Sequence, residues 1–485
     1  MQFSAHQKIS SDYDVVVVGA GLGGMTAANV LAKLGNKVLL LEAHNKLGGL
    51  ATWFTRQNNQ FVFDISLHGF PHGMVKTCRR HWNSDIANHL HPLKEVRFIN
   101  PQFDLKTSFD EVDYKRHLKE TFKVDPHSVE HFFGDLKEMN FYDNSQINNR
   151  ELFDKYFKGR NDVLRFLLEP IVYANGSTLE DPAISYGIVF SNFMNKGVYI
   201  YRGGTEEMIA KMQMELLKNG VDIQKQAMVK EILTSSHAGE KRVEGVVISR
   251  KCGDEIIKAR SVVSNGNLFK TLNELVGEKN LSDHFKSELK KVRPNSSSCQ
   301  VYMGLTGIEL PFMGDLLFTS EAETFSTEEL LSPKISCQTF SMYYPDMRPG
   351  KNLYSVVSSS NARYSDWENL SEAEYEERKK YLIERATSGL EKVIPGIKRH
   401  ITYTEASTPK TFEKFTHHYR GSSFGTKFEG LAVSQKVSDE IKGLFHTGSV
   451  GIIMSGWLGA ANYGVIVGNK CDSYLSQNNQ AEVNL

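Results

Sequence analysis

Three glycines and one glutamate near the N-terminus have the types and the spacing that bind a dinucleotide. The pattern Gly19-x-Gly21-x-x-Gly24 follows a β-branched run and opens a helix-like segment. The first glycine permits a tight turn, the second lets the backbone approach a pyrophosphate, and the third allows close packing of helix on strand. Helix N-terminal amides then favour the phosphate charge. Glu42 ends the next strand, where a carboxylate accepts hydrogen bonds from an adenosine ribose.

A second glycine pair predicts which dinucleotide is bound. Gly48-Gly49 follow Glu42 closely, and a glycine pair there lets the chain run along the pyrophosphate and flavin end of an extended cofactor. The chain has one complete glycine fingerprint, so we expect no separate nicotinamide domain. The sequence therefore predicts FAD rather than NAD.

Two histidines and one arginine are further candidates for chemistry. His68 and His72 lie in a segment that Gly69 and Pro71 make unsuitable for a helix, and no Glu or Cys completes a ligand set, so we expect no metal. A loop histidine near a flavin could donate a proton, since histidine titrates near neutral pH; otherwise His68 orients the loop. Arg420 could pair with a carboxylate, a phosphate or the flavin.

Composition limits the class of partner. The 485 residues carry 57 Lys plus Arg and 57 Asp plus Glu, a balance that argues against nucleic acid but leaves room for a local patch on a membrane. The five cysteines are scattered without a Cys-x-x-Cys, which argues against a disulfide framework. The polar N-terminus predicts no signal peptide, and the uncharged stretch 448–468 has six glycines, which favours a loop and a buried helix over a membrane span.

The helices and strands that must position these residues follow a nucleotide-binding pattern that begins at the N-terminus and reappears twice later in the chain. A buried strand at 14–18, a helix at 25–34 and a strand at 38–41 form a βαβ unit, and we expect a third strand at 61–63. Residues 75–200 are richer in charged and aromatic side chains. Nucleotide-domain patterns then reappear as a helix at 206–218, strands at 221–223, 227–233, 243–249, 255–257 and 261–265, and a strand, glycine loop and helix over 443–475.

This pattern predicts an α/β fold of two interleaved domains. A Rossmann-like FAD-binding domain is expected from residues 12–75, 200–295 and 439–475. A mixed α+β substrate domain is expected from residues 76–199 and 296–438. Aromatic side chains of the middle region could line a channel or pack in a core.

With these residues in hand, the chain resembles the FAD-dependent phytoene desaturase superfamily, which includes carotenoid desaturases, carotene cis–trans isomerases and retinol saturases. Leu67-His68 is similar to the saturase branch, while Ser358-Ser359 and Asp366-Trp367 are similar to the isomerase branch. The other motifs that carry the resemblance are 14–64, Tyr201-Arg-Gly-Gly204, Gly245-Val246, Val262-Val-Ser-Asn265, Thr408-Pro-x-Thr411, Arg420-Gly421, Phe424-Gly425 and Gly443-Leu-Phe-x-Thr-Gly448.

The resemblance implies an amine-oxidase/phytoene-desaturase-like architecture and a reaction at carbon–carbon double bonds. The expected substrate is a long lipophilic polyene, carotenoid or retinoid in kind, which would be desaturated, saturated or isomerised. The expected location is cytoplasmic and peripheral to a membrane. Two alternatives stay open: a flavin amine oxidase or protoporphyrinogen oxidase-like enzyme, and a non-enzymatic prenyl-lipid-binding escort. The electron partner and the oligomeric state are left open.

The resemblance also implies which residues touch the cofactor, and it shows departures. Ser449 stands where the family has an acid that holds the ribityl or phosphate region, and Tyr201 replaces a proline. His68 is the expected catalytic residue and Arg420 the expected substrate contact. The expected FAD contacts are Gly19, Ala20, Gly21, Leu22, Gly23, Gly24, Glu42, Ala43, Gly48, Gly49, Leu50, Val229, Gly448, Ser449 and Gly456.

Overall fold

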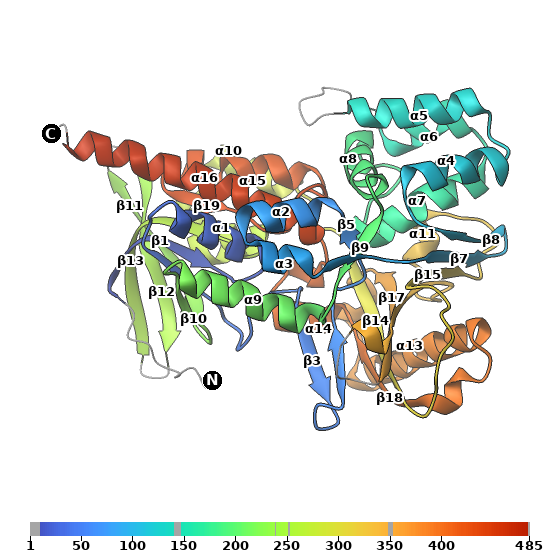
Figure 1. Ribbon diagram of the computed structural model, residues 1–485. Helices are drawn as coiled ribbons and strands as arrows, with labels where there is room; N and C mark the ends of the chain where they lie inside the picture. The colour runs from blue at the N-terminus through green and yellow to red at the C-terminus, as the bar shows by residue number, and fades with distance from the viewer. Residues whose placement is uncertain (1–9, 140–146, 238, 251–252, 348–352, 484–485) are drawn as a thin grey trace.

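The protein has two large β-sheets, which lie at opposite ends of the long axis with helices over both (Figure 1). The computed structural model describes residues 10–139, 147–237, 239–250, 253–347 and 353–483. Cys252 therefore lies outside the described residues, and the other four cysteines are free and buried.

The first sheet is built on the expected βαβ unit. β1 (Asp12–Val18) is a β-branched strand buried over Val15–Val18, and it pairs in parallel with β2 (Val38–Leu41) on one side and with β13 (Gly253–Ser264) on the other. β10 (Asp222–Gln224) continues the parallel sheet beyond β2. The helix α1 (Leu22–Lys33) lies between β1 and β2 in the chain.

Returning segments complete this sheet. β11 (Met228–His237), β12 (Glu240–Arg250) and β13 form an antiparallel meander. β19 (Leu444–His446) pairs in parallel with the far end of β13. The strands predicted separately at 255–257 and 261–265 are one continuous strand, because β13 pairs with β12 along its first half, up to Lys258, and with β1 along its second half, from Lys258 to Ser264.

The strand predicted at 61–63 is present, but it is not part of the first sheet. β4 (Phe61–Asp64) pairs with β3 (Trp53–Arg56) in a two-stranded ribbon, and β10 takes the place beside β2. Asp64 accepts a hydrogen bond from the Thr205 amide at the start of α9, which ties the ribbon to that helix.

The second sheet is mostly antiparallel and comes from two distant stretches of the chain. One face packs on the long helix α13 (Glu372–Val393), and their shared core includes Phe340, Leu382 and Leu390. Its strands, in spatial order, are β18 (Ile401–Ser407), β14 (Ser297–Leu305), β17 (Tyr354–Ala362), β16 (Cys337–Tyr343), β15 (Leu316–Ser320), β7 (Val96–Asn100) and β8 (Phe103–Thr107).

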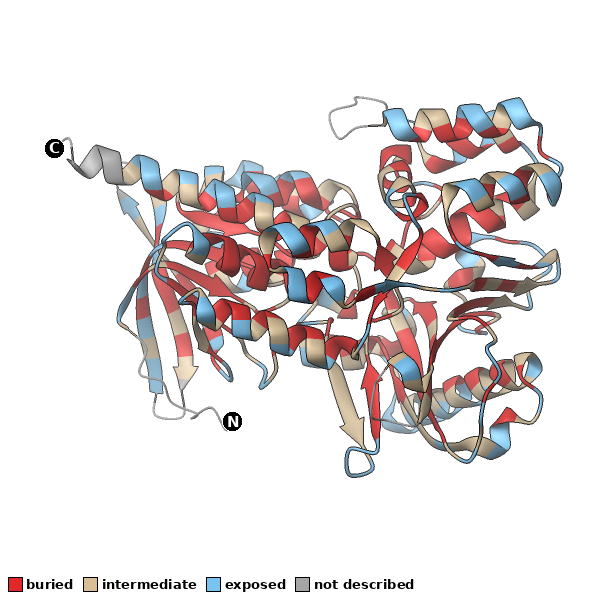
Figure 2. Ribbon diagram, viewed as in Figure 1, coloured by how far each residue is buried: buried red, intermediate tan, exposed pale blue. Residues whose placement is uncertain are grey.

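Helices with buried inner faces cover both sheets (Figure 2). The remaining sheet is small, with order β5 (Phe70–Pro71), β9 (Val198–Tyr201) and β6 (Leu90–Pro92). The other main helices are α2 (Gly73–His81), α3 (Ser84–Asn88), α4 (Glu111–Glu120), α5 (Pro126–Glu138), α6 (Asn149–Phe157), α7 (Asn161–Asn175), α8 (Ala183–Met194), α9 (Gly204–Lys218), α10 (Asp283–Lys291), α14 (Pro409–Thr416), α15 (Glu429–Glu440) and α16 (Gly456–Val483).

The uncharged stretch 448–468 is a loop and the first part of α16, as expected. Tyr463 and Val467 are buried, and α16 packs against α1. Within the described ranges, no helix has both the length and the apolar character needed to cross a bilayer. The predicted α/β class with a Rossmann-like unit is confirmed, while the domain boundaries stay predictions.

Candidate functional site

A cavity of about 1070 Å³ runs from the first sheet to the second. Ligand pockets for one small molecule usually measure about 300–1,000 Å³. The cavity therefore has room for an extended cofactor and part of a second molecule. The carboxyl ends of β1 and β2 open into one end of it, where ligands of parallel sheets bind.

Most residues predicted from the sequence to touch the cofactor line this cavity. The two exceptions are Ala20 and Gly24, which are buried behind the loop and are absent from the described lining residues. The predicted cofactor contacts and the predicted catalytic residue that line the cavity are Gly19, Gly21, Leu22, Gly23, Glu42, Ala43, Gly48, Gly49, Leu50, His68, Val229, Gly448, Ser449 and Gly456.

The side chain of Asn265, at the end of β13, explains why the glycine loop lacks side chains. A Cβ at Gly21 would lie 2.8 Å from Asn265 Nδ2, and a Cβ at Gly23 would lie 2.7 Å from its Oδ1. Asn265 Oδ1 also accepts a hydrogen bond of 2.9 Å from the Gly24 amide. The sequence analysis used Asn265 only as a family motif. Its position at the end of a buried strand next to β1 was the signal for a site residue.

Glu42 holds its carboxylate at the end of β2. One carboxylate oxygen accepts from the Ala20 amide at 2.7 Å and the other from the His44 amide at 2.8 Å. Burial raises the pKa of Glu42, while the hydrogen bonds from His44 and Ala20 oppose that shift. The carboxylate is therefore fixed beside the glycine loop, where the two hydroxyls of a ribose can reach it.

The backbone around the loop fits a pyrophosphate. Gly48 and Gly49 have φ of +115° and +63°, and a Cβ at Gly49 would lie 3.0 Å from Gly21 Cα. The two glycine segments therefore approach as closely as backbone allows. Among the described residues, the buried Thr447 Oγ1 beside Gly448 lacks a hydrogen-bond partner. These features fit a dinucleotide that lies along Gly21, Gly49 and Gly448.

His68 lies in the cavity wall between the two sheets and is held by hydrogen bonds to side chains of the second sheet. Its Nδ1 is 2.8 Å from Ser341 Oγ, and its Nε2 accepts from Gln300 Nε2 at 3.0 Å. Burial lowers the pKa of His68 to about 4, and Asp64 opposes the shift. The expectation that His68 titrates near neutral pH is therefore wrong, because the surrounding protein removes water from the ring.

Neutral polar side chains form the cavity surface on the second sheet. Tyr302 OH donates to Gln300 Oε1 at 2.6 Å, and Gln300 Nε2 donates to the Ile65 carbonyl at 2.8 Å. Ser359 and Asn361 on β17 alternate along the same face, as the two-residue period of a strand requires. On β14 and β17 this surface offers hydrogen bonds without charge, whereas Glu405 on β18 also lines the cavity and pairs with Arg56.

The opposite wall is formed by helices and is mostly apolar, with Asn175 and Asn192 as polar lining residues. Ile171 and Ala174 on α7 and Ile188, Val189 and Phe193 on α8 line the cavity there. Among the described lining residues contributed by α7, α8, β15, β16 and β17, none carries a charged side chain. This end of the cavity therefore suits a neutral lipophilic molecule.

Arg420 does not have the expected position. Its guanidinium lies 3.2 Å from both carboxylate oxygens of Glu368 and over the ring of Tyr364. It is not among the described residues that line the cavity. Of the three partners considered for it, the carboxylate is the one observed, and substrate contact is not supported. Among the described residues, no group of three or more His, Cys, Asp or Glu could hold a metal ion.

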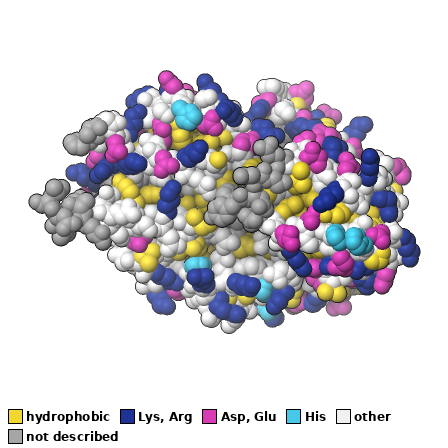
Figure 3. Space-filling view, turned by 90° about the horizontal axis from the view of Figure 1, so that it is seen from above, with side chains coloured by type: hydrophobic (Ala, Val, Ile, Leu, Met, Phe, Trp, Pro, Cys, Tyr) yellow, Lys and Arg dark blue, Asp and Glu magenta, His cyan; other side chains and the backbone are white. Residues whose placement is uncertain are grey.

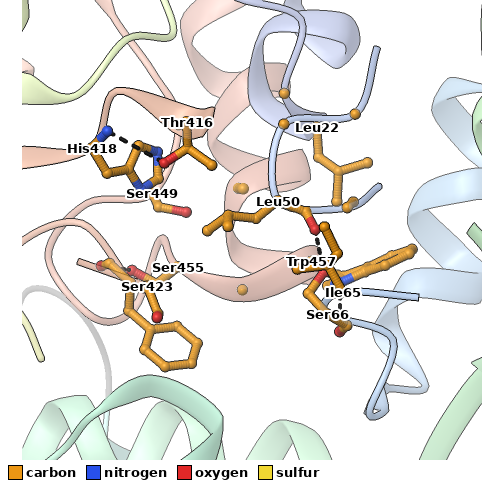
Figure 4. Close-up of a pocket in the computed structure, with 18 of the residues that line it drawn as sticks. Leu22, Leu50, Ile65, Ser66, Thr416, His418, Ser423, Ser449, Ser455 and Trp457 are labelled. Atoms are coloured by element: carbon orange, nitrogen blue, oxygen red, sulfur yellow. Dashed lines mark hydrogen bonds between the residues drawn. The ribbon is translucent and has the colours of Figure 1, made fainter. Parts of the chain in front are cut away.

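Figure 4 shows residues near the final loop that the sequence analysis did not assign to the site. The ring of His418 lies in the view next to Ser449, and both residues line the cavity. Trp457 Nε1 donates to Ser66 Oγ at 3.1 Å on the other side of the opening. Trp457 follows the predicted contact Gly456, and His418 lies between the Thr408–Thr411 and Arg420–Gly421 motifs, but only the fold shows that both side chains line the cavity.

Comparisons with known proteins agree with this architecture. Residues 17–83 match the model of the NAD(P)-binding Rossmann-like domain. All-trans-retinol 13,14-reductase of Danio rerio is 24% identical over 93% of this chain and 85% of that protein. Chloroplastic prolycopene isomerase of Daucus carota is 23% identical over 84% of this chain and 71% of that protein.

Solved structures share the fold at low sequence identity. An oxidoreductase from Methanosarcina mazei superposes with a TM-score of 0.66 at 16% identity, over 93% of this chain and 98% of that chain. Cyclohexylamine oxidase from Brevibacterium oxydans superposes with a TM-score of 0.63 at 13% identity, over 97% and 100%. These likenesses show the fold alone. Together with the two sequence relatives, they confirm the resemblance stated from the motifs.

Proposed function

Because the chain resembles the phytoene desaturase superfamily over most of its length, we propose that it is an FAD-dependent enzyme acting on carbon–carbon double bonds. The proposed substrate is a long lipophilic polyene, carotenoid or retinoid in kind, and the reaction is desaturation, saturation or cis–trans isomerisation. The observation that carries the proposal is the single cavity that joins the dinucleotide loop to the uncharged helical wall.

FAD is proposed at the end of the cavity that the first sheet forms. Glu42 would hold the ribose hydroxyls, and the backbone at Gly21 and Gly49 would lie along the pyrophosphate. When bound, a flavin supplies hydride transfer at its ring. The ring end of the cofactor would reach the part of the cavity near His68 and Trp457.

The lining of the other end favours a polyene over the amines and porphyrinogens considered above. An ammonium substrate needs a carboxylate or an aromatic cage to replace its water, and burial without a partner is costly. The described part of the α7, α8 and β15–β17 wall carries the aromatic rings of Tyr173, Phe193 and Phe318 but no carboxylate, and the missing carboxylate is what disfavours an ammonium substrate. A neutral, extended and apolar chain meets no such penalty against Ile171, Val189 and Phe193.

His68 stays a proposed active-site residue, with a changed role. At a pKa of about 4, about one ring in a thousand is protonated at pH 7. The neutral ring donates through Nδ1 to Ser341 and accepts through Nε2 from Gln300. We therefore propose that His68 positions Gln300 and Ser341 at the reacting end, rather than supplying a proton as a cation.

We further propose that the protein associates with a lipid surface peripherally, without a helix that crosses the membrane. Hydrophobic side chains gather along the middle of the face seen from above (Figure 3). Ile466 on α16 is 50% exposed and also lines the cavity, so the cavity reaches the protein surface there. Alkaline carbonate should release the protein from membranes; retention after carbonate would contradict this proposal.

The test of the proposed function begins with the purified protein. Denaturation should release FAD, measured by absorption and chromatography, and a protein that neither contains nor takes up FAD would favour the prenyl-lipid escort. Anaerobic incubation of all-trans-retinol with a reduced electron donor tests saturation, and incubation of a cis-carotene tests isomerisation. Incubation of a more saturated polyene with an oxidised electron acceptor tests desaturation, and the products are identified by mass spectrometry. Turnover of primary amines without turnover of any polyene would favour an amine oxidase.

A further inference from the structure

His418 presents a hydrogen-bond acceptor to the cavity. Its Nδ1 is 2.8 Å from the carbonyl oxygen of Ser422. Because a carbonyl oxygen only accepts, the proton of the neutral ring must be on Nδ1. Nε2 then carries a lone pair. His418 lines the cavity and is half-buried.

His418 stays neutral in its surroundings. Burial lowers the pKa of the His418 ring, and the nearby His417 and Lys270 lower it further, while the Ser422 carbonyl opposes the shift. Lys270 and His417 also line the cavity. The charges around His418 therefore disfavour a second proton on Nε2.

Ser449 lies on the segment that adjoins the His418 loop. Ser422 Oγ donates to the Gly425 carbonyl at 2.7 Å, and a Cβ on Gly425 would overlap the carbonyl oxygen of Ser449. Figure 4 shows the His418 ring and the Ser449 side chain at the same edge of the pocket. These contacts place His418 beside the final loop of the dinucleotide domain.

The final loop in turn lies on the N-terminus of α1. A Cβ at Gly23 would lie 3.0 Å from Gly448 Cα, so Gly448 touches the turn that would face a pyrophosphate. If FAD binds as proposed, the next residue, Ser449, would lie just beyond the phosphates, toward the ribityl chain. A ribityl chain carries hydroxyl groups that need acceptors when water is excluded. Serine is a weaker acceptor than the acid that the resemblance implies at this position.

We infer that His418 Nε2 accepts a hydrogen bond from a ribityl hydroxyl of FAD, and so replaces the carboxylate that position 449 lacks. The inference rests on the proposed function, because it requires FAD in this cavity. It assigns a part in binding the cofactor to His418, a residue that the sequence did not predict to touch FAD. Ser449 would contribute its hydroxyl beside it.

Two substitutions at one position separate the acceptor from the loop anchor. His418→Asn keeps a donor at the place of Nδ1 for the Ser422 carbonyl and removes the acceptor at the place of Nε2. His418→Gln keeps a polar group at the place of Nε2. The dissociation constant of FAD is measured by flavin fluorescence on apoprotein of each variant and of the unchanged protein.

We expect FAD binding to weaken roughly 2- to 12-fold in His418→Asn, the equivalent of one neutral hydrogen bond, and to change less than about twofold in His418→Gln. Adding Ser449→Asp to His418→Asn should restore binding. Equal affinity of the Asn variant and the unchanged protein would overturn the inference while leaving the proposed function intact. Absence of FAD binding by the unchanged protein would instead overturn the proposed function.

A cationic role is the rival outcome. If His418 were protonated against the pyrophosphate, FAD binding would take up a proton, and the Asn variant would lose affinity mainly below pH 7. Proton uptake is measured by calorimetry in buffers of different ionisation enthalpy. The inference requires no uptake that depends on His418, and uptake abolished by His418→Asn would overturn it.

Discussion

One end of the cavity is formed mainly by backbone atoms, and the other end mainly by side chains. At the first sheet the surface is mostly backbone: Gly21, Gly49 and Gly448 bring main-chain atoms together, and Glu42 is the one carboxylate of the motif. At the second sheet the surface is mostly side chain, with Gln300 and Ser359 on strands facing the apolar helices α7 and α8.

This difference explains what each end recognises. A backbone cradle binds a group that is the same in every dinucleotide, and it tolerates no added Cβ. A wall of side chains can change one residue at a time, so it determines which lipophilic molecule fits. Substitutions at the two ends should therefore separate cofactor binding from substrate binding.

The largest effect is expected at the backbone end. In Gly21→Val the new side chain fills the place of the pyrophosphate and overlaps Asn265 Nδ2, which lies 2.8 Å from the position of the Cβ. We expect no measurable FAD in the purified variant, by visible absorption. Gly134→Val is the control, because a Cβ on Gly134 in α5 meets no atom within 4 Å. A yellow Gly21→Val protein would contradict the assignment.

A smaller effect is expected where the two ends meet. His68→Gln should lower kcat about tenfold through the loss of one or two hydrogen bonds, with normal FAD content. His68→Asn keeps a donor toward Ser341 and should lose less. The pH profile of kcat should have the same shape in both variants. A loss of about 100- to 10,000-fold, together with disappearance of an alkaline limb of the pH profile, would restore the general acid role.

At the side-chain end we expect a change in substrate affinity alone. Val189→Ala removes two methyl groups from the apolar wall and should raise KM about 3- to 10-fold, with FAD affinity unchanged. Val112→Ala on α4, where the side chain is 81% exposed, is the matched control. A parallel loss of FAD in Val189→Ala would mean that the two ends are not separable.

The smallest expected effect is a loss of folding stability at acidic pH. His446 on β19 is 2% exposed, and burial lowers its pKa to about 4 from 6.5. The unfolded chain therefore binds the proton first, and the stabilisation present above pH 6.5 is lost as the pH falls toward 4. Between pH 7 and 5 this histidine should cost about 2 kcal/mol in the free energy of unfolding.

Chemical denaturation at pH 7 and pH 5 tests this loss. His446→Asn should lose less stability between the two pH values than the unchanged protein does. An equal loss in both proteins would assign the acid sensitivity to other groups, with the equally shifted His68 as the first candidate.

The sequence pointed to residues that line the backbone end of the cavity, and it missed most of those that line the side-chain end. Gly19, Gly21 and Glu42 were identified because a local pattern and its strand context carry the whole requirement. Gln300 was missed because its partners His68 and Ile65 are brought to it by the packing of distant segments. His418 was missed although its partner Ser422 is only four residues away, because only the fold shows that its ring lines the cavity. The carboxylate that pairs with Arg420 belongs to Glu368, 52 residues away, and no local pattern predicts which carboxylate that is.

Secondary structure shows the same contrast between what local sequence predicts and what tertiary packing determines. The strand at 61–63 was recognised from its own residues, whereas its pairing with β3 depends on a ribbon that leaves the sheet. The domain boundaries and the roles of the cofactor residues stay predictions. The pKa of His68 could not be foreseen, because it depends on how much water the folded chain removes from the ring.

The interleaving of the chain has a consequence for folding. β19 pairs with β13 at the edge of the first sheet, and α16 packs on α1. Both are separated from β1 by more than 400 residues in the chain. Contacts so distant in sequence slow folding, because the segments between them must be made and ordered first. Gly448 and Ser449 follow β19, so this side of the dinucleotide loop stays open until residues 444–449 have packed against it. If FAD binds here as proposed, it would bind tightly only after both distant segments are in place.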